Sequence, residues 1–218
     1  MELRRDLGEY VSDLSDAELA TFVETMLGEA RSLGFHTEAE IAAFARPCVC
    51  YGAFSHLDPI FEPRFYVSLP GCSARRRLSA KGVSLATERV LRLEFAKRSG
   101  VRLIADLADV FLTGNHPESG VLTPIEIHFP ERFARLPPGA LQAHLDLAAH
   151  EADKLRLSDP VERRVHGDVA QLLGACFERD PLYPWAIAAF SGANSDARRT
   201  SRLRTALKLI AEKAALGV

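Results

Sequence analysis

The side chains best suited to chemistry in this 218-residue chain are histidines, acids and cysteines in two short stretches. His144 and His150 invite a metal interpretation, but a zinc-binding pair on one helix is four residues apart and these are six apart. Asp146 and His150 do have the i, i+4 spacing, which is typical of a pair on a helix surface. We therefore predict no metal site, and a half-buried packing role for His144.

Cys48 and Cys50 are too close together for a zinc knuckle or a thioredoxin-type redox pair, and no second pair follows. On a helix the two side chains would point about 200° apart, so at most one faces a core. The sequence also contains no Gly-rich phosphate loop, no nucleophile elbow and no spaced pair of carboxylates. These observations predict no catalytic residue, no cofactor and no enzymatic activity.

The overall composition is that of an ordinary globular protein, with 47% hydrophobic and 26% charged residues. No apolar run approaches the roughly 18–20 residues of a membrane span. The charged N-terminus does not resemble a secretory signal. Four Cys without repeated spacing favour a reducing compartment, so we expect a cytoplasmic protein. A net charge of −2 makes nucleic acid an unlikely partner.

Charge is unevenly distributed along the chain. Residues 1–60 contain four basic and eleven acidic side chains, whereas residues 73–100 contain eight basic and two acidic ones. Either these segments neutralise each other within the fold, or each attracts a partner of opposite charge. For the second case Glu18 and Glu24 are the candidate partner-binding residues. The basic segment has no aromatic residue between 73 and 94 to stack on bases, which disfavours single-strand binding.

Helix signals dominate the sequence. Ser15 with Glu18, and Thr37 with Glu40, are capping boxes that open two amphipathic stretches, and Gly34 follows the first as a stop signal. The apolar residues of the first stretch recur at helical spacing. The pattern predicts an all-α helical bundle, with a short strand or extended segment near 123–129, where apolar residues alternate.

The chain also resembles itself at an offset of 122 residues. Residues 14–59 align with residues 136–181 without a gap, with ten identities. A capping residue with its Glu recurs, as does a Gly six residues before an Asp-Pro step: Gly52 with Asp58, and Gly174 with Asp180. We predict one compact domain over 1–218, in which two similar helical hairpins, joined by a basic middle segment 62–135, form an internal duplication. We expect each Asp-Pro step to start a helix.

Trp185, the only Trp, directly follows Tyr183 and Pro184, shortly after the second Asp-Pro step. Two interpretations are open. It packs beneath that step, or it is exposed and anchors a partner, as interface Trp residues often do.

The run from Glu29 to Phe44, EARSLGFHTEAEIAAF, followed by GAFSHLDP at 52–59, resembles the helical C-terminal region of type VI secretion effector-loading adaptors. It also resembles small accessory proteins encoded beside their effectors. Residues 174–181 look like a degenerate second copy of this pattern. The resemblance implies a protein-binding role as an adaptor, chaperone or accessory protein, with a secreted effector, spike protein or toxin as the partner. It implies no catalytic residue. The alternatives are a cytoplasmic immunity protein that blocks a toxin and a nucleic-acid-binding regulator.

Overall fold

The computed structural model describes residues 14–60, 126, 130–134 and 136–190, and six positions between 202 and 212. All regular elements within these residues are α-helices or short 3-10 helices, so the predicted all-α class is confirmed for this part of the chain. Of the extended segment expected near 123–129, only Glu126 is described, and it is helical. The basic stretch 73–100 lies outside the described residues.

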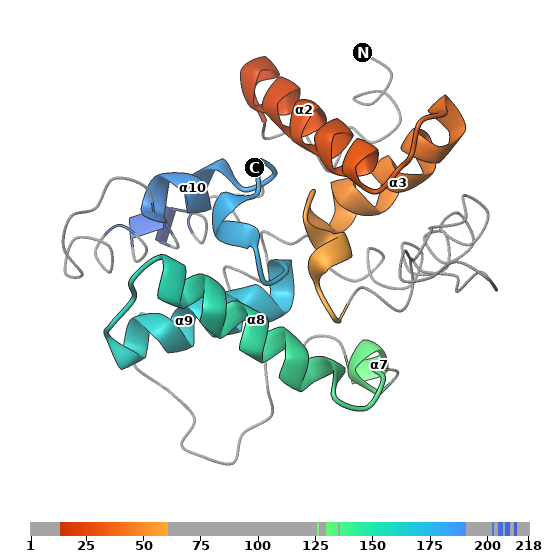
Figure 1. Ribbon diagram of the computed structural model, residues 1–218. Helices are drawn as coiled ribbons and strands as arrows, with labels where there is room; N and C mark the ends of the chain where they lie inside the picture. Colours follow the sequence, from red (N-terminus) through yellow and green to blue (C-terminus); the bar gives the residue numbers. More distant parts are fainter. Residues whose placement is uncertain are drawn as a thin grey trace.

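The N-terminal half, residues 14–60, is a helical hairpin followed by a short turn of 3-10 helix (Figure 1). It comprises α2 (Asp16–Ser32), α3 (Glu38–Tyr51) and η1 (Ser55–Leu57). Both predicted capping boxes are present, because each cap hydroxyl accepts a hydrogen bond from the N3 backbone N–H and the N3 Glu carboxylate accepts one from the backbone N–H of the cap residue. These caps fix where the two helices begin.

The C-terminal half, residues 136–190, has a similar order of elements. It comprises α8 (Ala140–Lys154), α9 (Pro160–Leu173), η3 (Phe177–Arg179) and α10 (Pro184–Phe190), and the short α7 (Pro130–Phe133) precedes it. The bounds of α9 and η3 lie 122 residues after those of α3 and η1. The two halves therefore share the register of these elements, not only their order.

The first helix of each half ends in the same turn. Gly34 follows α2 at φ 86°, and the N–H of Phe35 donates to the carbonyl of Ala30. After α8, Arg156 takes the left-handed conformation at φ 57°, and the N–H of Leu157 donates to the carbonyl of Ala152. Both are Schellman turns. The sequence predicted the first from its Gly, whereas the second uses a residue type that rarely adopts this conformation.

The Asp-Pro step starts a turn rather than the helix we expected. Asp180 Oδ1 accepts a hydrogen bond from the N–H of Leu182, which forms an Asx turn, and α10 begins only at Pro184. Asp58 Oδ1 accepts the equivalent bond from Ile60. The expectation failed because the short side chain of Asp can accept a hydrogen bond from the N–H of the residue two positions later. This bond closes a turn, and no helix needs to follow.

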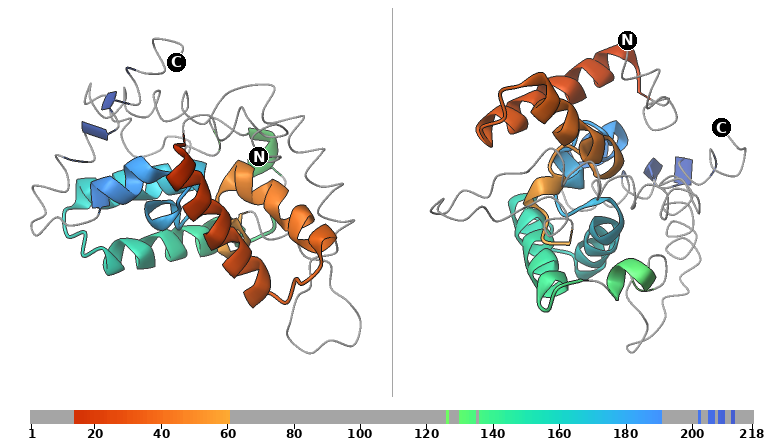
Figure 2. Two further views of the ribbon diagram at one scale, coloured as in Figure 1. Left: turned by 90° about the horizontal axis from the view of Figure 1, so that it is seen from above. Right: turned by 90° about the vertical axis from the view of Figure 1, so that its right-hand side faces the viewer.

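Two apolar cores lie side by side, one for each hairpin. The hairpins occupy opposite sides of the molecule and their ends meet between them (Figure 2). Phe22 and Met26 fill the first core, against which Leu141 and Leu182 of the other half also pack. In α8, Ala149 is exposed while Glu151 is buried. None of the described helices is both long and apolar enough to cross a membrane.

Candidate functional site

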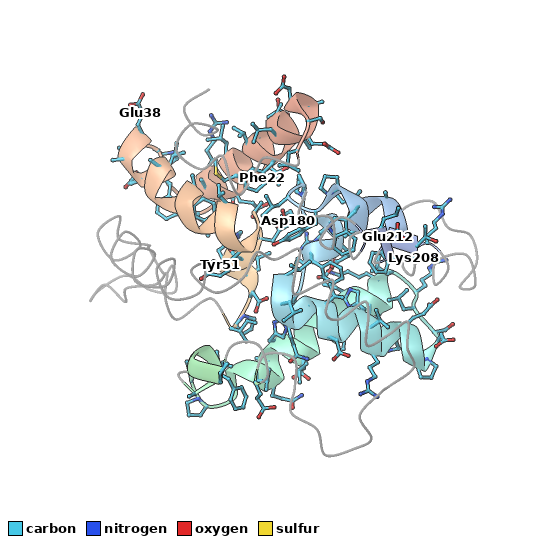
Figure 3. All side chains as sticks on the ribbon, turned by 180° about the vertical axis from the view of Figure 1, so that it is seen from behind. Phe22, Glu38, Tyr51, Asp180, Lys208 and Glu212 are labelled. Carbon is cyan, nitrogen blue, oxygen red and sulfur yellow. The ribbon has the colours of Figure 1, made fainter. Side chains whose placement is uncertain are left out.

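The most unusual feature of the described residues is a pair of buried aspartates, Asp58 and Asp180, where the two halves meet. Their side chains are only 1% and 2% exposed. Each one follows a 3-10 helix and accepts a hydrogen bond from the backbone of the opposite half. Figure 3 shows Asp180 near the centre of the molecule. We call these two residues, with the N–H groups they bind, the crossed aspartate pair.

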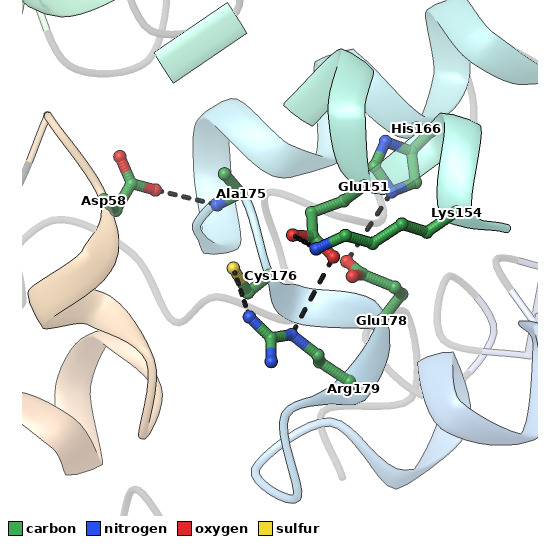
Figure 4. A network of polar contacts seen from close by, with 8 residues as sticks. All are labelled: Asp58, Glu151, Lys154, His166, Ala175, Cys176, Glu178 and Arg179. Carbon is green, nitrogen blue, oxygen red and sulfur yellow. Dashed lines mark hydrogen bonds and ion pairs between the residues drawn. The ribbon is translucent and has the colours of Figure 1, made fainter. Parts of the chain in front are cut away.

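Asp58 makes contacts on both sides of the interface. Its Oδ2 accepts a hydrogen bond of 2.7 Å from the N–H of Ala175 at the end of α9 (Figure 4). Its Oδ1 lies 2.8 Å from Nδ1 of His144, and it also accepts the turn bond from Ile60. His144 on α8 is fully buried. Three contacts thus compensate the buried carboxylate, one of them with a titratable side chain.

Asp180 makes the reciprocal contact. Its Oδ2 accepts a hydrogen bond of 3.3 Å from the N–H of Phe54, just after α3, and its Oδ1 accepts the turn bond from Leu182. Burial raises the pKa of Asp180 to about 6, although the backbone N–H bonds oppose this shift. Gly52 is required here, because its φ is 92° and an added Cβ would collide with Asp180 Oδ2. The absence of a side chain at Gly52 lets this carboxyl group approach the turn.

The crossed aspartate pair is suited to holding two hairpins together rather than to catalysis. Both side chains are almost wholly inaccessible, and each carboxylate oxygen already accepts at least one hydrogen bond. A general base or nucleophile must instead reach a substrate. Removing either acceptor would leave a buried N–H in the opposite half without its partner, which is costly.

A second polar cluster lies within the C-terminal half, around Glu151 (Figure 4). Lys154 Nζ is 2.7 Å from Glu151 Oε1, and Arg179 Nε is 3.9 Å from Glu151 Oε2. Arg179 also donates to the sulfur of Cys176 at 3.3 Å and stacks on Phe54 of the other half, 4.4 Å from the ring centroid. Burial raises the pKa of Cys176 to about 11, so this thiol is protonated and a poor nucleophile at neutral pH.

The buried histidines have acidic neighbours in both halves. In the N-terminal half His56 Nε2 lies 3.1 Å from Glu29 Oε2, and burial lowers the pKa of His56 despite this contact. In the C-terminal half His166 Nε2 lies 3.6 Å from Glu178 Oε2, and both side chains are buried. The described residues contain no group of three or more His, Cys, Asp or Glu that could hold a metal ion. Each pair places a buried histidine beside an acid of the same half.

The structure places the residues singled out from the sequence in several different environments. His144 is fully buried and bonded to Asp58, so the predicted half-buried packing role is wrong. His150 is exposed, whereas Cys48 is buried in the first core. Trp185 is partly buried against the second core, with its ring centroid 6.3 Å from that of Phe177.

The candidate partner-binding acids differ from each other. Glu18 is half-buried and completes the capping box of α2, and its hydrogen bonds with Ser15 lower its pKa. Glu24 is exposed on the outer face of the same helix. Only Glu24 can therefore be changed without disturbing a helix start.

Sequence reasoning found the residues of the crossed aspartate pair but not their role. The duplicated Gly and Asp-Pro step was visible, and we interpreted the Asp as a helix cap. The available signal was the exact recurrence of Gly six residues before Asp in both halves, which indicates a close backbone approach rather than a cap.

No protein-family model matches the chain, and neither a curated protein nor a solved structure matches it.

Proposed function

We propose that this protein is a non-enzymatic protein-binding module that serves a type VI secretion effector as an adaptor, chaperone or accessory protein. The supporting observation is that the polar side chains of the two clusters described above bind other groups of this chain. The two aspartates hold the halves together, and the acids and bases around Glu151 pair within one half. Such a use of polar groups is typical of a rigid scaffold that presents its outer surface to a partner.

We further propose that the scaffold arose by internal duplication at the offset of 122. Matching bounds of α3 with α9 and of η1 with η3 support this, as do the Schellman turns. Asp58 and Asp180 are also related by the offset, and each accepts an N–H from the opposite half, which is the arrangement expected if two copies of one unit met through a two-fold contact.

The α2–α3 hairpin is the surface that we assign to the partner. Its exposed acids include Asp16, Glu24 and Glu38, and its exposed bases include Arg31. An acidic surface attracts a basic partner and mainly accelerates association, because exposed charges act over roughly 8–10 Å at physiological salt. The type VI partner itself is proposed from the sequence resemblance.

Reversing two exposed charges tests this surface. The double variant Glu24→Lys and Glu38→Lys should reduce the association rate with the product of the neighbouring effector gene about tenfold. Asp146→Lys is the matched control, since Asp146 is exposed on α8 in the other half. Glu18→Lys is unsuitable because it would break the cap of α2. Equal rates for the double variant and the control would contradict the assignment.

The second candidate function is that of an immunity protein, which the same acidic surface favours. A toxin that acts on nucleic acid or anionic substrates has a basic active site, and exposed acids on α2 and α3 would cover it by charge complementarity. Co-expression with the adjacent toxin gene distinguishes the two roles. An immunity protein restores growth, whereas an adaptor binds without restoring it. A nucleic-acid-binding role depends on the basic segment 73–100, outside the described residues.

A further inference from the structure

We draw no further inference here: the strongest candidate, the half-buried apolar surface around Trp185 at the start of α10, carries none because nothing in the structure shows what covers it.

Discussion

The two halves of this protein share the bounds of a helix and of a 3-10 helix but have different buried polar side chains. α3 and α9 each contain 14 residues and are followed by Gly at positive φ, a 3-10 helix and a buried Asp. The pairs of a buried histidine and an acid differ between the two halves. The comparison indicates that the same bounds of a helix and of a 3-10 helix are compatible with different internal polar pairs.

The buried residues of the two halves differ at two related positions, one on the helix and one on the 3-10 turn. In the N-terminal half the helix supplies Phe44 and the 3-10 turn supplies His56, whose rings lie 5.6 Å apart. In the C-terminal half the helix supplies His166 and the turn supplies Glu178, which lie 3.6 Å apart at their closest polar atoms. The histidine thus lies on the 3-10 turn in the N-terminal half and on the helix in the C-terminal half, where an acid occupies the turn. In both halves this part of the core places a buried histidine beside an acid.

The largest effect is expected at the turn that both halves share. Gly52→Ala places a methyl group against Asp180 Oδ2 at a φ that L-residues rarely adopt. We expect a loss of about 2–5 kcal/mol in the free energy of unfolding, from backbone strain together with overpacking. Urea denaturation of the full-length protein measures the loss. Gly28→Ala in α2 is the control, because nothing lies within 4 Å of its added Cβ, and it should stabilise the helix.

An intermediate effect is expected where the two aspartates differ. His144→Phe makes the site of Asp58 resemble that of Asp180, since Phe22 already occupies the related position. We expect a loss of about 1–3 kcal/mol at pH 7, because a buried carboxylate loses a hydrogen-bond partner. Urea denaturation of the full-length protein measures the loss. An unchanged free energy of unfolding would show that His144 only fills space.

The smallest effect is expected at the turn after α8. Arg156→Gly replaces a residue in the left-handed conformation with glycine, which is the residue type at the related position, Gly34, after α2. We expect a gain of about 0.5–1 kcal/mol, since relief of backbone strain exceeds the added chain entropy of Gly. Thermal unfolding measures the gain, and Gly34→Ala should give a loss of similar size. If Arg156→Gly were destabilising, the Arg side chain would have a role that the turn geometry does not reveal.

Much of the fold could be predicted from local sequence signals. Ser15 with Glu18, Thr37 with Glu40, and Gly34 each act over a few residues, and the structure confirms all three. The apolar stripe of α2 was also predictable, because its helical period is regular. By contrast, the start of α10 was misplaced, since an Asx turn and a helix cap begin with the same residue types.

The crossed aspartate pair could not be predicted because it depends on contacts between distant parts of the chain. The bond from Ala175 to Asp58 joins residues 117 positions apart, and that from Phe54 to Asp180 joins residues 126 apart. Capping patterns contain no information about such pairs. His144 was assigned too little burial for the same reason, since its partner Asp58 lies 86 positions away.

The most direct test of how the halves are joined is amide exchange in the full-length variants Asp58→Ala and Asp180→Ala. We predict that Asp58→Ala removes protection from the N–H of Ala175, and that Asp180→Ala removes it from the N–H of Phe54. The amides of Gly52 and Gly174 are the controls, because each donates within its own half to the carbonyl four residues earlier, and they should remain protected. Loss of protection confined to the substituted half would contradict the reciprocal contact.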